Sequence, residues 1–154
     1  GWLYVATVLD LFSRRIVGLA MSERMTADLV TQALQQALIH RKPPANLLHH
    51  SDKGSQYTSR QFLSVLRANN IIPSMSGNGN CFDNAAMESF YHTLKTEHVY
   101  FESYKSRQEA KQSIFEYVEV FYNRKRRHST LGYCAPRVFE ENWRKQNISL
   151  LTVH

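Results

Sequence analysis

The sequence predicts an α/β layer domain. Short apolar segments of strand length alternate with longer segments whose apolar residues recur every three to four positions. Strands mixed with helices in this order are typical of a sheet covered by helices. The length of 154 residues fits one domain, and a hydrophobic content of 43% is enough for a packed core. We find no internal repeat, low-complexity tract or domain linker.

The chain opens with a predicted β-hairpin and a helix. Residues 2–9 (WLYVATVL) and 16–21 (IVGLAM) are rich in β-branched and aromatic side chains, and Asp10 lies in the turn-forming segment between them. Apolar residues at helical spacing then follow a capping residue, Thr26. This helix must end before the two prolines that follow it.

The middle of the chain is predicted to contain two short strands around a helix. The strands are residues 46–50 and 71–75, and Thr58 and Gln61 have the spacing of a capping box for the helix between them. Proline cannot donate to a strand ladder, so Pro73 indicates that the second strand lies at a sheet edge.

Two further helices are predicted in the second half. A segment rich in glycine and asparagine, 76–84, precedes the first of them and is expected to be a mobile loop. Asp83 or Asn84 can cap this helix. Ser106 and Glu109 form a capping box for the second helix.

Charge and cysteine content bound the class of protein. Nineteen Lys and Arg against thirteen Asp and Glu give a net charge of +6, the sign expected of a protein that meets phosphates. Cys81 and Cys134 have no paired spacing, so we expect free thiols in a reducing compartment and no zinc motif. No segment has the pattern of a signal peptide or a membrane span, which predicts a soluble, intracellular protein.

Two carboxylates are candidates for phosphoryl-transfer chemistry. Asp52 ends the strand of HHSDKGSQY, Glu88 lies early in the helix after the glycine-rich segment, and thirty-five residues separate them. Two-metal phosphoryl transfer needs converging carboxylates to hold Mg²⁺ or Mn²⁺. Taken alone, Asp52 followed by Lys53 and Gly54 is also an ordinary turn signal. The presence of Glu88 is what makes Asp52 a candidate metal ligand and not only a turn residue.

Four separated segments resemble, in order, the catalytic core of DDE transposases and retroviral-type integrases, closest to bacterial insertion-sequence transposases of the OrfB type. They are WLYVATVLDLFSRRIVG, HSDKGSQYTS, DNAAMESFYHTLKTE and FYNRKRRHSTLGYCAP. The resemblance implies a ribonuclease-H-like mixed sheet flanked by helices, over residues 1–139, with 140–154 as a C-terminal tail. It also implies that Asp52 and Glu88 are the second and third acidic ligands of catalytic Mg²⁺ or Mn²⁺.

The resemblance also implies a missing part. In this family the first metal-binding aspartate lies on a central strand upstream of the hairpin, and no matching strand precedes Trp2. Asp10 is a weak substitute because an aspartate before a hairpin turn has a local explanation. We therefore expect a truncated, incomplete site, inactive as the chain stands, with exposed edges on the neighbouring strands.

DNA contacts are expected at two places. His92 and Lys95 follow Glu88 by four and seven residues and share its helix face, which can also be an ordinary solvated face. The cation run Arg124, Lys125, Arg126, Arg127 and His128 can neutralise several phosphates, or can simply complement a helix end. The resemblance favours DNA, so transposon ends, target DNA and further copies of the chain are the expected partners, in the bacterial cytoplasm at the nucleoid.

The predicted function is DNA transposition by metal-dependent phosphodiester cleavage and strand transfer. Two alternatives remain open, namely a non-catalytic DNA-binding or multimerisation remnant of a transposase, and a ribonuclease-H-type nuclease. His49 and His50 are expected to pack or to support the site, since no other His or Cys stands at zinc-site spacing.

Overall fold

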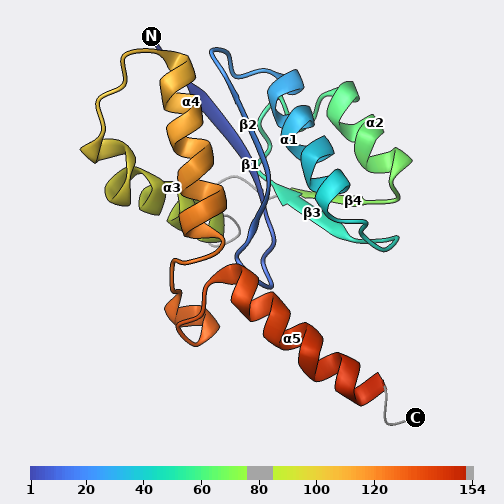
Figure 1. Ribbon diagram of the computed structural model, residues 1–154. Coiled ribbons are helices and arrows are strands. Elements are labelled where there is room, and N and C mark those ends of the chain that lie inside the picture. The colour runs from blue at the N-terminus through green and yellow to red at the C-terminus, as the bar shows by residue number, and fades with distance from the viewer. Residues whose placement is uncertain (76–84, 152–154) are drawn as a thin grey trace.

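A β-hairpin lies at the centre of the structure, between α1 and α2 on one side and α3 and α4 on the other (Figure 1). The computed structural model describes residues 1–75 and 85–151, except for the side chains of 149–151. The elements, in chain order, are β1 (Tyr4–Leu9), β2 (Ile16–Ser22), α1 (Ala27–His40), β3 (Leu48–Ser51), α2 (Arg60–Ala68), β4 (Ile72–Met75), α3 (Ala85–Glu97), the 3₁₀ turn η1 (Val99–Phe101), α4 (Arg107–Glu116), the π-helical segment η2 (Tyr117–Tyr122), the 3₁₀ turn η3 (Ser129–Leu131) and α5 (Pro136–Leu151).

The strands form two separate two-stranded sheets. β1 and β2 pair antiparallel from Tyr4↔Ser22 to Leu9↔Ile16, with an irregularity between Val8 and Leu9. β3 and β4 pair in parallel, from Leu48↔Ile72 onward. Within the described residues no ladder joins β1 to β3, so the mixed character predicted for the sheet is present but the sheet is divided.

Two apolar cores form on the two faces of the hairpin because successive strand residues point to opposite sides. One core joins the hairpin to α1 and α2, and its buried members are Ala6, Ala20, Leu29, Val30, Ala33, Leu34, Phe62, Leu66 and Ile71. The other joins the hairpin to α3, α4 and η2 through Ile16, Leu19, Phe90, Leu94, Ile114, Tyr117, Val118 and Tyr122. The hairpin is therefore the element on which both halves of the chain are assembled.

The helix starts follow the capping residues closely. The side chains of Thr26 and Ser106 accept backbone N–H groups of α1 and α4, as predicted. The capping box assigned to Thr58 is wrong by one residue: Ser59 is the cap and accepts from the Phe62 N–H at 3.1 Å. Ser59 has the extended backbone of a cap and directs its hydroxyl at the first turn, whereas the Thr58 hydroxyl donates to Ser55 O and does not cap the helix.

The C-terminal part of the chain is helical. Helix α4 passes into η2, where the Asn123 N–H bonds to Val118 O five residues back. Helix α5 then begins at Pro136, a residue suited to the first helical position, and projects away from the hairpin (Figure 1). The predicted boundary between residues 139 and 140 falls inside this helix.

The expectations for the two cysteines and for residues 76–84 can be compared with the structure only in part. Cys134 carries a free thiol, as predicted. Cys81, the loop 76–84 and the cap at Asp83 or Asn84 lie outside the described residues. Among the helices that the structure describes, none has the length and apolar character needed to cross a lipid bilayer.

Candidate active site

A cavity of about 1150 Å³ separates the two sheets. Consecutive residues of β1, Val5–Leu9, and of β3, Leu48–Ser51, line it. Alternate strand residues face opposite sides of a sheet, so an unbroken run lining one cavity means that the edge of each strand borders it. The cavity therefore runs along two strand edges that, within the described residues, have no ladder partner.

Asp52 and Glu88 both line this cavity and both are exposed. Asp52 follows β3 directly, and its Oδ1 accepts the Gly54 N–H at 2.7 Å, which holds the turn that ends the strand. Glu88 lies in the first turn of α3. The structure thus brings to one cavity two carboxylates that are thirty-five residues apart in the sequence.

Helix α3 is fixed to β1 on either side of Glu88. The Thr7 hydroxyl lies 3.1 Å from Met87 Sδ and 3.0 Å from the Tyr91 hydroxyl, and Tyr91 also donates to Val5 O at 3.1 Å. Met87 and Tyr91 flank Glu88 on α3, so these contacts fix the position of the Glu88 carboxylate relative to β1.

The described residues contain no group of three or more His, Cys, Asp and Glu side chains that could hold a metal ion. Asp10 lines the same cavity, but its carboxylate serves the hairpin turn. Its Oδ1 accepts from Phe12 N at 2.9 Å and from Ser13 N at 3.4 Å, and its Oδ2 lies 3.5 Å from Arg41 Nη2. The turn role predicted for Asp10 is confirmed.

His49 and His50 are held by neighbouring side chains. The His49 ring packs edge-on against Phe62 with centroids 5.3 Å apart, and burial lowers the pKa of His49. His50 Nδ1 lies 3.0 Å from Ser74 Oγ, which ties β3 to β4 beyond the backbone ladder. Both contacts fit the supporting roles expected of these histidines.

His92 and Lys95 share the exposed face of α3 with Glu88. The buried residues of this helix, Phe90 and Leu94, lie on its other side and pack into the second core. A basic group one and two turns from Glu88 can therefore reach a polyanion that lies along this face. Their role in DNA binding stays a prediction.

The cation run after η2 divides into paired and unpaired groups. Arg126 forms a two-pronged contact with Glu97, with Nη2 2.8 Å from Oε1 and Nε 2.8 Å from Oε2. These hydrogen bonds lower the pKa of Glu97 and raise that of Arg126. Arg124, Lys125 and Arg127 are exposed, and none has an ion pair within the described part of the chain.

His128 differs from its neighbours because it is neutral at pH 7. Burial, and then the adjacent charge of Arg126, lower the pKa of His128 to about 4. Its ring packs edge-on against Tyr122 at 5.0 Å, and its backbone N–H donates to Cys134 O at 3.0 Å. At neutral pH it can therefore contribute contacts to bound DNA but no positive charge.

The pH dependence of stability should report this histidine. The pKa of His128 is lowered from 6.5 to about 4 by folding. Between these two values the unfolded chain binds a proton at this residue and the folded chain does not, so the free energy of unfolding falls as the pH drops from 6.5 to about 4. His128→Asn should reduce the loss of stability between pH 7 and pH 5 in urea unfolding. The matched change at exposed His92 should leave that loss as it is in the unsubstituted chain; an equal effect of both would contradict the assignment.

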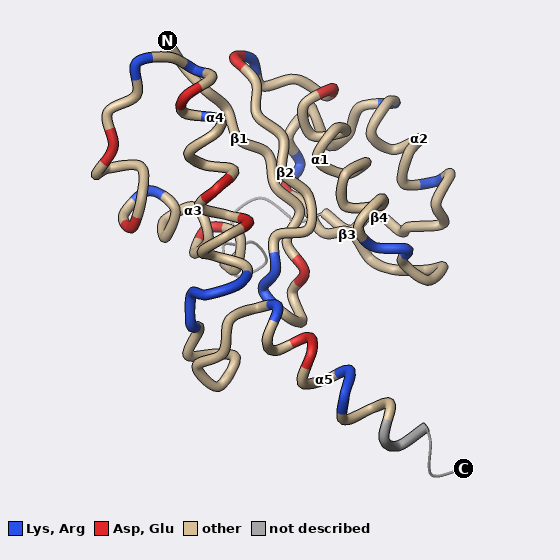
Figure 2. Tube along the Cα trace, in the orientation of Figure 1, with Lys and Arg blue, Asp and Glu red and all other residues tan. Residues whose placement is uncertain are grey.

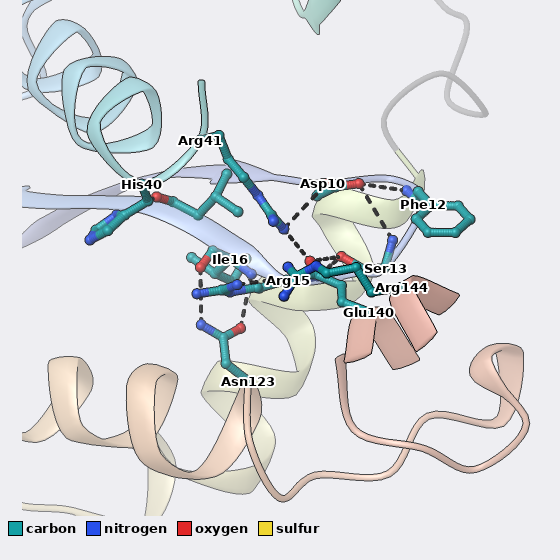
Figure 3. A network of polar contacts seen from close by, with 11 residues as sticks. Asp10, Phe12, Ser13, Arg15, Ile16, His40, Arg41, Asn123, Glu140 and Arg144 are labelled. Carbon is teal, nitrogen blue, oxygen red and sulfur yellow. Dashed lines mark hydrogen bonds and ion pairs between the residues drawn. The ribbon is translucent and has the colours of Figure 1, made fainter. Parts of the chain in front are cut away.

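A polar network that the sequence does not signal joins the hairpin to the C-terminal helix (Figure 3). Glu140 of α5 is 7% exposed and accepts from Ser13 Oγ at 2.7 Å and from Arg15 Nη1 at 3.1 Å, and Arg41 also bonds to it. Asn123, 1% exposed, bonds through its side chain to both backbone groups of Ile16. More than a hundred residues separate these partners from the hairpin, so no local pattern reveals them.

The chain matches the integrase core domain family over residues 1–81 and a second integrase core domain family over 88–143. It is 48% identical over 140 residues to the InsF transposase of insertion sequence IS3 from Escherichia coli, which covers 91% of this chain and 49% of that protein. It is also 48% identical over 143 residues to an uncharacterized 31 kDa protein of insertion element IS600 from Shigella sonnei, covering 93% of this chain and 53% of that protein. The chain thus spans about half the length of these relatives.

Solved structures of low sequence identity share the fold. The HTLV-2 integrase catalytic core domain, solved in complex with magnesium in a trimeric form, has a TM-score of 0.68 at 15% identity over 89% of this chain and 82% of that one. The catalytic core domain of BIV integrase has a TM-score of 0.65 at 19% identity, covering 93% and 89%. The predicted ribonuclease-H-like fold class is confirmed. The chain belongs to the integrase core domain family.

Proposed function

We propose that this chain is the catalytic core of a bacterial insertion-sequence transposase and acts in phosphodiester cleavage and strand transfer with Mg²⁺ or Mn²⁺. The observation that carries the proposal is the convergence of Asp52 and Glu88 on one cavity. Carboxylate oxygens are the donors that these hard cations prefer, so the two side chains fit the ions. The bound metal would polarise the reacting phosphate and its attacking oxygen.

The protein's own part in this chemistry is to hold the two carboxylates in place. Asp52 is fixed at the end of β3 by its turn with Gly54, and Glu88 by the contacts that α3 makes with Thr7. In this proposal both are ligands and neither is a nucleophile. The magnesium complex of the HTLV-2 integrase core, which shares the fold, supports a divalent cation here.

The divided sheet supports the proposal that the site is incomplete within these residues. β1 and β3 border the same cavity, and two carboxylates are fewer than a two-metal site needs. We propose that a further strand, bearing the third carboxylate, lies between β1 and β3 in the active enzyme. It would pair with both edges and fill the cavity, so the chain by itself should not join DNA.

The proposed function also predicts the binding partners, which are DNA and further copies of the chain. Transposon-end DNA would lie along the exposed face of α3, at His92 and Lys95, and target or end DNA along Arg124, Lys125 and Arg127. Arg126 would act mainly through its pair with Glu97, and His128 as a neutral contact. Assembly of several copies on paired DNA ends, in the cytoplasm at the nucleoid, belongs to this proposal and is supported by the trimeric form of the HTLV-2 integrase core.

A chimera tests the function. Residues 1–154 would replace the matching part of the E. coli InsF transposase, and cleavage and joining of IS3 ends would be measured with Mg²⁺ and Mn²⁺. We expect joining by the chimera, and a loss of at least about a hundredfold on Asp52→Asn or Glu88→Gln, because a neutral amide is a poor ligand for these cations. Asn can still accept the Gly54 N–H, so the turn survives the first change.

The control variant is Glu102→Gln, an exposed carboxylate outside the cavity, which should join DNA normally. Joining that survives Asp52→Asn would contradict the metal role. Hydrolysis without joining would favour the nuclease reading, and DNA binding without either reaction would favour the non-catalytic remnant. DNA joining by residues 1–154 alone would contradict the proposal that a further strand with a third carboxylate is needed.

A further inference from the structure

Asn123 joins the hairpin turn to two later segments that lie more than a hundred residues from it in the sequence. Its side chain accepts the Ile16 N–H at 2.9 Å and donates to Ile16 O at 3.0 Å, which repeats the pairing of a neighbouring strand (Figure 3). Its backbone oxygen accepts the Arg137 N–H at 2.9 Å. The hairpin turn, the end of η2 and the first turn of α5 therefore meet at one buried residue, Asn123.

Each of these segments carries a cation next to the junction. Arg14 lies two residues before Ile16, Arg124 follows Asn123 directly, and Arg137 is the residue bonded to it. Figure 2 shows the blue of the hairpin turn beside the blue of the run after η2. The arrangement gathers onto one part of the molecule positive charges that the sequence places more than a hundred residues apart.

The cations around the junction differ from the other arginines nearby in lacking counter-charges. Arg15 and Arg41 are paired with Glu140, and Arg126 with Glu97. Arg14 and Arg137 have no ion pair within the described residues, like Arg124, Lys125 and Arg127. Cations of like sign that lack a paired carboxylate leave a positive potential on segments that the junction joins, and a polyanion is the ligand that would neutralise it.

Arg14 is held by its own turn, and its charge acts at the end of η2. Arg14 has a left-handed backbone, with φ of 62°, and its N–H donates to Asp10 O at 2.7 Å, so the turn that presents it is fixed. Burial raises the pKa of Tyr122 to about 12, and the charges of Arg126 and Arg14 oppose that rise. The guanidinium of Arg14 therefore acts at the end of η2.

We propose that Arg14 and Arg137 extend the cation run at Arg124, Lys125 and Arg127 into one surface that binds the phosphate backbone of duplex DNA, with Asn123 as the positioning residue. This rests on the proposed function, because that function supplies the DNA. Arg14 is followed only by Arg15, which is paired with Glu140, and Arg137 has no cation next to it in the sequence, so sequence alone does not join either residue to the run at 124–127. The surface is assembled by the fold.

Binding of the 154-residue chain to a fluorescein-labelled duplex, by anisotropy over a series of salt concentrations, tests the proposal. Each cation that contacts a phosphate adds about 0.9 to the slope of log affinity against log salt. Arg14→Gln and Arg137→Gln should each lower the slope by about that amount, and the double variant by about twice as much. Arg67→Gln, an exposed cation on α2, should leave the slope unchanged.

The outcomes separate this surface from the catalytic proposal. The inference would be overturned if the slopes of Arg14→Gln and Arg137→Gln matched that of Arg67→Gln, or if the unsubstituted chain showed no salt-dependent binding. Neither result would bear on the catalytic proposal, which is tested separately by DNA joining in the chimera. Unfolding midpoints should stay unchanged in both variants, because Arg137 bonds to Asn123 through its backbone and Arg14 holds its turn through its backbone. A weaker slope accompanied by a normal midpoint cannot come from a merely structural role.

Discussion

Gly18→Ala should destabilise the folded chain by about 3 kcal/mol or more, the largest loss expected from adding a single methyl group here. A Cβ at residue 18 would lie 2.1 Å from Ala33 O and 3.2 Å from the Ala37 Cβ, because α1 crosses β2 at this point. A backbone oxygen cannot swing aside as a side chain can. The hairpin and α1 would have to separate, and urea unfolding measures the cost.

Strand propensity argues for the opposite sign. Glycine inside a strand loses more conformational freedom than alanine, so Gly18→Ala on an open strand would gain about 0.5–1 kcal/mol. Gly54→Ala is the comparison variant, since its Cβ would meet side-chain atoms of Asp52 and Gln56 and no backbone atom. We expect a smaller loss there than at Gly18, because those side chains can shift while a backbone oxygen cannot. A neutral or stabilising Gly18→Ala would show that α1 does not pack against β2 this closely.

Glu140→Gln should cost about 3 kcal/mol at pH 7, near the lower end for breaking a buried ion pair. The substitution keeps the shape of the side chain but leaves Arg15 and Arg41 facing a neutral group. Those arginines retain partial contact with water, at 21% and 27% side-chain exposure, which limits the loss. Urea unfolding at pH 7 gives the magnitude.

The effect of Glu140 should depend on pH. Burial acts to raise its pKa, but the hydrogen bonds from Arg41 and Ser13 and the two arginine charges hold that pKa below its usual value. A depressed pKa stabilises the fold above the unfolded value near 4.5, and this contribution disappears as pH falls through the folded value. The difference between the unsubstituted chain and Glu140→Gln should therefore shrink on acidification.

Glu141→Gln is the matched control, because the neighbouring carboxylate is exposed. It should change stability little at any pH. Hydrogen exchange over α5 gives a second readout, since Glu140 and the contacts of Phe12 with Phe139 and Trp143 hold this helix to the hairpin turn. Unaltered exchange in Glu140→Gln would contradict the anchoring role of the network.

Sequence patterns predicted the elements that depend on local signals. The hairpin and α1 follow from β-branched runs, an aspartate turn and a threonine cap, each of which acts within a few residues. The spacing of Asp52 and Glu88 predicted their common site, and the structure places both at one cavity. Their role as ligands remains a proposal.

Long-range polar contacts could not be predicted in this way. Glu140 stands in an unremarkable charged segment, and its partner Ser13 is 127 residues away. The basic run after Asn123 is conspicuous in the sequence, but the residue that joins this run to the hairpin is Asn123, through its buried side-chain amide. Helix α5 does have a local signal, since Pro136 suits a first helical position and Val138, Phe139 and Trp143 follow at helical spacing.

The π-helical segment η2 makes the junction sensitive to chain length. Both Asn123 N–H to Val118 O and Arg126 N–H to Phe121 O span five residues, one more than an α-helix allows. Deleting a single residue from 117–122 would let α4 continue as an ordinary helix and turn all that follows by about 100°. The amide of Asn123 would then leave Ile16, and relatives that insert or delete a residue here would need a different way to hold the hairpin.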